Sequence, residues 1–194
     1  MYDKLNITEN HLKILSLFTG GNEFYIREVQ KILGISPRTA QLILDDLEKK
    51  TVLESKVRGK IKMYKLKKTQ AAKDYFIMTE QYKKLCFIKD DMLKEIIEKI
   101  TPHIKGIALI FGSYVKRKQK KSSDLDVFVA GSYNKEELQN ISKLYGIHIS
   151  VKTYTLTIFK KHIRDDILIR EVLDDHIIIK GVEEFVNARW KWTR

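Results

Sequence analysis

The sequence has few features that would cross-link the chain or anchor it in a membrane. A single cysteine, Cys86, excludes an internal disulfide, and we expect that thiol to lie in the core. No run of about 18 uncharged apolar residues is present, so no membrane span is expected. Residues 1–15 are too polar for a secretion signal. These absences favour a globular protein of the cytoplasm.

Acidic residues are also few relative to basic ones. The chain has 25 Asp and Glu against 37 Lys and Arg, which gives a formal net charge of +12. Such a surface attracts polyanions through a long-range, salt-sensitive force. A lysine-rich surface that is merely solvated is the alternative. The placement of the charges along the chain has to decide between the two.

The first 69 residues show helical periodicity followed by a strand pair. The expected elements are, in order, helices at 11–18, 26–33 and 37–50 and strands at 52–57 and 60–66. Ser36 is a suitable N-cap, and Pro37 suits the first turn of the third helix. Arg58–Gly59 has the composition of a hairpin turn.

Two helices joined by a tight turn and followed by a basic hairpin resemble the winged-helix DNA-binding domains of prokaryotic regulators. The resemblance makes the helix at 37–50 the recognition helix and the hairpin the wing, and it implies double-stranded DNA as a partner. Side chains suited to base or phosphate contacts are Arg38, Thr39, Gln41, Lys56, Arg58, Lys60 and Lys62. A winged helix used for protein contact is the alternative.

Residues 70–104 read as a helical connector that is interrupted near Lys89 and ends at Pro102. Its apolar residues recur at helical spacing, which is typical of a core or of a dimer interface. A homodimer that forms through this stripe is therefore one of the expectations.

The remaining residues, 105–194, alternate strands and helices. The expected elements are strands at 106–113, 125–131 and 147–155, helices at 135–146 and 157–175, and a closing apolar run at 176–181.

Two short motifs stand at the ends of neighbouring expected strands. Gly112 and Ser113 end one apolar strand, and Asp124 and Asp126 begin the next. Side chains alternate along a strand, so both carboxylates point to one face, about 7 Å apart. Such a pair can hold hard divalent cations, and glycine lets a ligand approach the backbone closely. The basic run KRKQKK at 116–121 lies between the motifs and suits a polyanionic ligand.

This spacing resembles the minimal nucleotidyltransferases of the DNA polymerase β superfamily, and the segment from His176 onward resembles the tails of archaeal members. The resemblance implies that a nucleoside triphosphate is bound by Gly112, Ser113, Lys116 and Ser123. It also implies that Asp124 and Asp126 bind Mg²⁺ and act as catalytic residues.

Two features depart from that family. Its active members usually carry a third carboxylate on the next strand, where this chain presents His148, Ser150 and Lys152. Arg117 stands at a position that is commonly glycine, and a positive φ is uncommon outside glycine. The loop conformation is therefore expected to differ, and the enzymatic activity is left open.

The sequence thus predicts an α+β chain in three parts. These are a winged helix-turn-helix at 1–69, a connector at 70–104, and at 105–194 a nucleotidyltransferase-like mixed sheet with flanking helices. The first hypothesis is a DNA-binding, transcription-regulator-like protein whose second domain binds metal-nucleotide or nucleic acid, with catalysis reduced or lost. The second is an active Mg²⁺-dependent enzyme that transfers a nucleotide to a protein or RNA acceptor, in the manner of an antitoxin. The third is an assembly module.

Overall fold

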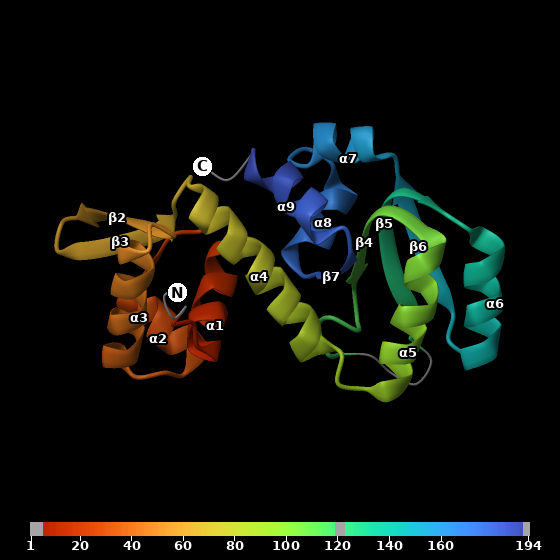
Figure 1. Cartoon of the computed structure of the whole chain (residues 1–194), viewed down its shortest axis with the longest axis horizontal. Coiled ribbons are helices and arrows are strands. Elements are labelled where there is room, and N and C mark those ends of the chain that lie inside the picture. Colours follow the sequence, from red (N-terminus) through yellow and green to blue (C-terminus); the bar gives the residue numbers. More distant parts are fainter. Residues whose placement is uncertain (1–5, 119–122, 192–194) are drawn as a thin grey trace, which may run out of the picture. The chain divides into compact units, whose positions relative to one another are not determined.

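The computed structural model describes residues 6–118 and 123–191. The chain folds as two compact units, the first reaching to Tyr82 and the second running from Lys83 to Lys191 (Figure 1). None of the described helices combines the length and the apolar composition needed to span a bilayer. The fold class is α+β, as the sequence predicted.

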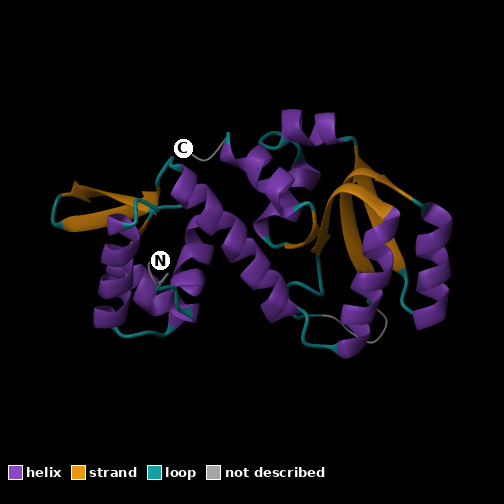
Figure 2. Ribbon diagram, viewed as in Figure 1, coloured by secondary structure: helices purple, strands orange, loops and turns teal. Residues whose placement is uncertain are grey.

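The first unit consists of helices and a three-stranded antiparallel sheet of order β1-β3-β2 (Figure 2). Its elements are α1 Glu9–Phe18, β1 Phe24–Tyr25, α2 Ile26–Leu33, α3 Pro37–Lys49, β2 Leu53–Arg58, β3 Ile61–Leu66 and α4 Gln70–Phe87, which continues into the second unit. The sequence did not predict β1. Its two residues gain their strand geometry from pairing with Tyr64 and Met63 of β3, which are distant in the chain.

Local signals set the bounds of α2 and α3 as expected. α2 ends at Gly34, whose φ of 65° is a left-handed conformation that favours glycine. The Ser36 hydroxyl accepts a hydrogen bond from the Thr39 amide at 3.0 Å, and Pro37 opens the helix. The inward face of α3 is buried, and it consists of Ala40, Ile43, Leu44 and Leu47.

The second unit is built on a four-stranded sheet of order β6-β5-β4-β7. β5 pairs antiparallel with β4 and parallel with β6, so the sheet is mixed. Its elements are α5 Asp91–Ile100, the 3-10 turn η1 Thr101–His103, β4 Ile104–Phe111, β5 Leu125–Tyr133, α6 Lys135–Tyr145, β6 Ile149–Tyr154, α7 Leu156–His162, α8 Ile167–Asp174, β7 Ile177–Lys180 and α9 Val182–Trp190.

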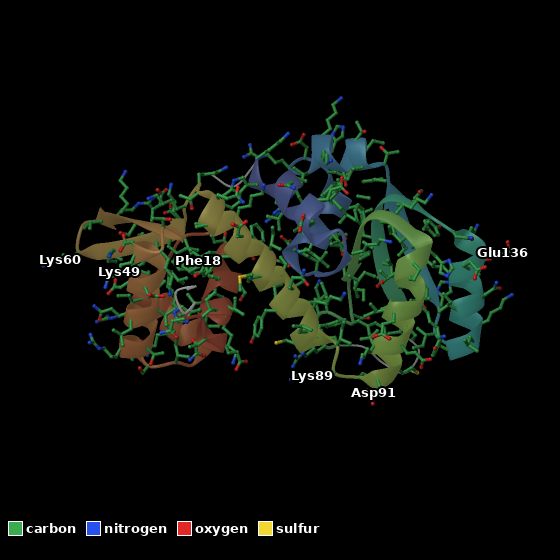
Figure 3. The ribbon with its side chains drawn as sticks, viewed as in Figure 1. Phe18, Lys49, Lys60, Lys89, Asp91 and Glu136 are labelled. Atoms are coloured by element: carbon green, nitrogen blue, oxygen red, sulfur yellow. The ribbon has the colours of Figure 1, made fainter. Side chains whose placement is uncertain are left out.

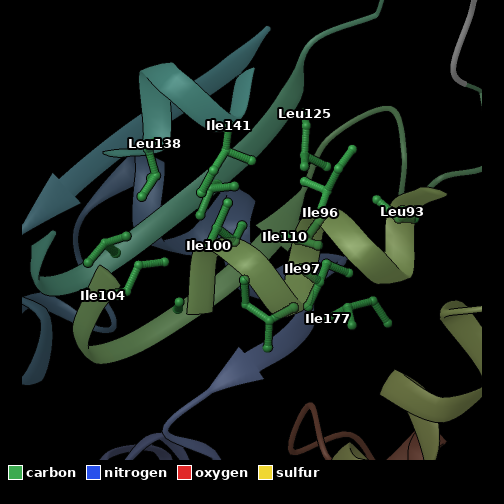
Figure 4. Close-up of a cluster of buried hydrophobic side chains, with 14 residues drawn as sticks. Leu93, Ile96, Ile97, Ile100, Ile104, Ile110, Leu125, Leu138, Ile141 and Ile177 are labelled. Atoms are coloured by element: carbon green, nitrogen blue, oxygen red, sulfur yellow. The ribbon is translucent and has the colours of Figure 1, made fainter. Parts of the chain in front are cut away.

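Helices cover both faces of this sheet (Figure 1). α5 and α6 pack on one face, where Leu125 and Val127 of β5 join a buried cluster with Ile96 and Ile141 (Figure 4). α7 and α9 pack on the other face through an aromatic chain in which Phe128 lies 5.9 Å from Phe159 between ring centroids. The apolar stripe of α5 is therefore part of the core of this unit.

Two expectations need correction, and a third is confirmed. The single helix expected at 157–175 is two helices, because Asp166 caps a new helix by accepting from the Ile169 amide at 2.9 Å. The break expected near Lys89 is confirmed, and Asp90 caps α5 in the same way. Cys86 is only partly buried, because it lies near the end of α4.

Candidate functional site

One edge of the second unit's sheet brings together the polar side chains that the sequence singled out. Phe111, the last residue of β4, pairs with Asp126 of β5. On the other side of β5, Ser150 of β6 pairs with the same Asp126. The ends of three strands therefore meet around one carboxylate.

Gly112 leaves room for that carboxylate. Its φ is 75°, and a Cβ added to it would lie 2.5 Å from Oδ2 of Asp126. A side chain at this position would collide with the carboxylate and would strain the backbone. The glycine therefore allows the Asp126 carboxylate to lie against the main chain at the start of the loop.

A turn of helical type follows Gly112. The Lys116 amide donates to the Gly112 carbonyl at 3.2 Å, and the Lys118 amide donates to the Ser113 carbonyl at 2.9 Å. Within the described part of the chain, the amides of Ser113 and Tyr114 donate to no backbone acceptor. Amides free at the start of such a turn are donors for anions, so the turn is suited to phosphate oxygens.

The basic loop continues this turn. Arg117 adopts a φ of 52°, so it reaches the left-handed region although it is not glycine. Lys116, Arg117 and Lys118 are all exposed and carry three positive charges next to the carboxylates. The rest of the basic run, 119–121, lies outside the described residues.

Several neighbouring groups influence the ionisation of Asp126. Burial raises the pKa of the half-buried Asp126, and the neighbouring charge of Asp124 raises it further, whereas Lys152 and a hydrogen bond from Ser150 lower it. Asp124 directly precedes β5, and its side chain is 53% exposed. The carbonyl of Ser123 accepts a hydrogen bond from the Tyr114 hydroxyl at 3.5 Å, which ties this segment to the turn. A divalent cation would relieve the repulsion between the carboxylates.

No carboxylate comes from β6, and the three residues expected there take different positions. Nδ1 of His148 lies 3.2 Å from Oδ2 of Asp124. Ser150 lowers the pKa of Asp126 through a hydrogen bond, and Lys152 lowers it through its positive charge. A different carboxylate, Glu171 on α8, contributes a negative charge that also raises the pKa of Asp126. The sequence did not point to Glu171, because it lay inside a helix expected to run unbroken.

The donor set fits magnesium better than a metal held by protein ligands alone. Among the described residues, no group of three His, Cys, Asp or Glu is arranged to hold a metal. Mg²⁺ is usually bound through one or two carboxylates, with water and substrate phosphates as its other ligands. Asp124 and Asp126 would supply the carboxylates, and the phosphates would come from a ligand in the turn.

In the first unit, the residues expected at DNA lie on α3 and on the β2–β3 hairpin. Arg38 and Gln41 are exposed on α3, and the Thr39 hydroxyl shares a hydrogen bond with that of Ser36 at 2.8 Å. Lys56 and Lys60 are exposed, Lys60 at the hairpin tip (Figure 3). In the part of the chain that the structure describes, Arg38, Lys56 and Lys60 form no ion pair.

Two other hairpin cations have acidic partners. Nη2 of Arg58 lies 2.8 Å from Oε2 of Glu23. Nζ of Lys62 lies 2.6 Å from Oε2 of Glu48 on α3, and 4.8 Å from the ring centroid of Tyr64. The hydrogen bond to Glu48 raises the pKa of Lys62, although burial opposes it. The sequence did not show these partners.

The same network fixes the hairpin to α3. The Tyr64 hydroxyl donates to Asp45 at 3.1 Å, and the Ser55 hydroxyl donates to Glu48 at 2.5 Å. Burial raises the pKa of Glu48, but hydrogen bonds from Lys62 and Ser55 outweigh it and lower the pKa below its ordinary value. The acidic residues late on α3 therefore bind the hairpin.

Comparison with known proteins identifies the class of the second unit. Residues 91–184 match the family model described as polymerase beta, nucleotidyltransferase. This segment carries the Gly112 turn and both aspartates, and it forms a nucleotidyltransferase-like domain. No curated protein matches the chain.

Solved structures show only distant likeness. AF1382 from Archaeoglobus fulgidus has 23% identity and a TM-score of 0.36, over 45% of this chain and 96% of its own. RosR of H. salinarum has 22% identity and a TM-score of 0.36, over 52% of this chain and 94% of its own. TrmBL2, described as an archaeal chromatin protein with a novel mode of DNA binding, has 11% identity and a TM-score of 0.31, over 89% and 72%. At these TM-scores the likenesses carry no functional argument.

Proposed function

We propose that the nucleotidyltransferase-like domain binds a nucleoside triphosphate together with Mg²⁺ at the Gly112 turn. The observation that carries this proposal is the Asp126 carboxylate, which lies against Gly112 at the start of a turn. Among the described residues, no backbone acceptor takes the amides of Ser113 and Tyr114 in that turn. Ser113 and Lys116 would hold phosphate oxygens, Ser123 would border the nucleotide, and Asp124 and Asp126 would hold the metal. The bound metal would neutralise phosphate charge and polarise the phosphorus centre.

The first unit would bind double-stranded DNA as a winged helix. Its support is three exposed cations on α3 and the hairpin, Arg38, Lys56 and Lys60, which form no ion pair with any residue that the structure describes. α3 would enter the major groove, and the hairpin would contact the phosphate backbone. The protein would then be a DNA-binding regulator that senses a nucleotide, with catalysis reduced because β6 supplies no carboxylate.

Calorimetric titration with ATP and GTP, with and without Mg²⁺, tests the nucleotide site. Wild type should bind one of them only with the metal present, and an Asp124→Asn/Asp126→Asn variant should not bind. The matched control is Asp174→Asn, an exposed carboxylate at the end of α8. If wild type and the double variant bind equally, or neither binds, the proposal fails.

A second candidate function is transfer of a nucleotide to a protein or RNA acceptor. It is favoured by Glu171 on α8, whose negative charge raises the pKa of Asp126, where β6 supplies no carboxylate. The test is incubation of labelled triphosphates and Mg²⁺ or Mn²⁺ with the protein and candidate acceptors. Absence of label on every acceptor, at full nucleotide binding, contradicts this function and leaves the binding proposal standing.

A further inference from the structure

The outward face of α3 carries one large apolar side chain that the first unit does not bury. Leu42 is 53% exposed, whereas the inward residues of the same helix, such as Leu44 and Leu47, are fully buried. A single exposed leucine is common on protein surfaces. What distinguishes Leu42 is its position on the helix that carries Arg38 and Gln41.

Leu42 lies within the group of side chains proposed to face the DNA bases. Gln41 and Leu42 follow Arg38 by three and four residues, so both lie on the side of the helix that carries Arg38. Arg38 and Gln41 carry the donors that read guanine and adenine in the major groove. A leucine beside Arg38 offers no hydrogen bond and fits only an apolar surface.

Asp45 lies three residues beyond Leu42 and would repel DNA if its charge faced the groove. The structure directs that carboxylate elsewhere. Its Oδ1 accepts from the Tyr64 hydroxyl at 3.1 Å and lies 3.6 Å from Nζ of Lys62. The hairpin thus holds the Asp45 carboxylate and places a positive charge near it, which lessens its repulsion of a polyanion at the face with Leu42.

We propose that Leu42 reads a thymine by packing on its 5-methyl group, next to the base pairs contacted by Arg38 and Gln41. The methyl group is the apolar feature that distinguishes thymine in the major groove. The partner is duplex DNA, because the same unit exposes Arg38 on this face and Lys56 and Lys60 on the hairpin. This inference rests on the proposed DNA-binding function.

The test begins with selection of a preferred duplex from a random library by the full chain. Each thymine of that site is then replaced by 2′-deoxyuridine, which removes only the methyl group, and affinity is measured by fluorescence anisotropy at fixed salt. One replacement should weaken wild-type binding about fourfold, the value of one buried methyl. Leu42→Ala should bind the thymine and deoxyuridine duplexes equally.

Ile32→Ala is the matched control, because Ile32 on α2 is also 53% exposed. This variant should keep the wild-type response to deoxyuridine. The inference is overturned if no thymine responds in wild type, or if Leu42→Ala keeps the response, while selective DNA binding itself stands. If no duplex is selected at all, the DNA-binding function fails and the inference fails with it.

Discussion

Nδ1 of His148 lies 3.2 Å from Oδ2 of Asp124, at the edge where β5 and β6 begin side by side. An imidazole N–H at this position would donate to one carboxylate oxygen and orient the other. Hydrogen bonds of this kind to a ligating carboxylate hold it in place for a metal. His148, just before β6, thus supports the carboxylate of Asp124, just before β5.

From this contact we predict that His148→Ala weakens Mg²⁺-dependent nucleotide binding. The expected loss is about tenfold, at the low end of the range for such supporting residues, because both side chains are more than half exposed. Calorimetry with the preferred triphosphate measures it. His148→Asn should restore most of the affinity, because the Asn amide can donate from nearly the same place. Equal weakening in both variants would contradict the orienting role.

A second prediction concerns Gly112. Gly112→Ala places a Cβ against Oδ2 of Asp126 and keeps a φ of 75°, so it should destabilise the domain by about 1–3 kcal/mol. It should also abolish nucleotide binding, because the carboxylate has to move. Thermal unfolding and calorimetry measure the two effects. The control is Gly146→Ala at the end of α6, where φ is 64° but a Cβ meets nothing within 4 Å. That variant should lose stability without losing binding.

The sequence predicted those parts of the fold that depend on local signals. Ser36 and Pro37 begin α3, and Gly34 ends α2, because caps and left-handed turns act over a few residues. It missed features that require distant partners. β1 forms only because β3 lies beside it, and Glu171 influences Asp126 only after α8 has packed on the unit.

The candidate site follows the same division. The proximity of Gly112 to Asp126 could be predicted, since the two residues stand at adjoining ends of one strand pair. The partners of Asp124 and Lys62 could not, because they depend on strand register and side-chain direction. The sequence also suggested that arginine at 117 would alter the loop, yet Arg117 adopts a positive φ.

A third prediction is a pH dependence of stability in the first unit. The pKa of Glu48 in the folded protein lies below its ordinary value of 4.5. Its contribution to the free energy of unfolding is therefore complete above pH 4.5 and is lost as the pH falls through the folded pKa. Glu48→Gln should cost about 0.5–1 kcal/mol at pH 7 and show a shallower loss of stability below pH 4.5. Urea unfolding from pH 3 to 7 measures both. Glu54→Gln, which breaks a more exposed pair with Lys65, should follow the wild-type curve.

The last prediction compares two hairpin cations, Arg58, which pairs with Glu23, and Lys60, which has no ion pair among the described residues. Each phosphate neutralised by a cation contributes about 0.9 to the slope of log affinity against log salt. Lys60→Ala should therefore make the slope for the selected duplex less steep by nearly that amount. Arg58→Ala should lower it by less, because Glu23 already offsets the Arg58 charge at 2.8 Å. Lys105→Ala, an exposed cation on β4, should leave the slope unchanged. Equal changes in the Lys60 and Arg58 variants would mean that the ion pair with Glu23 opens on DNA, and no change in either would exclude the hairpin from the interface.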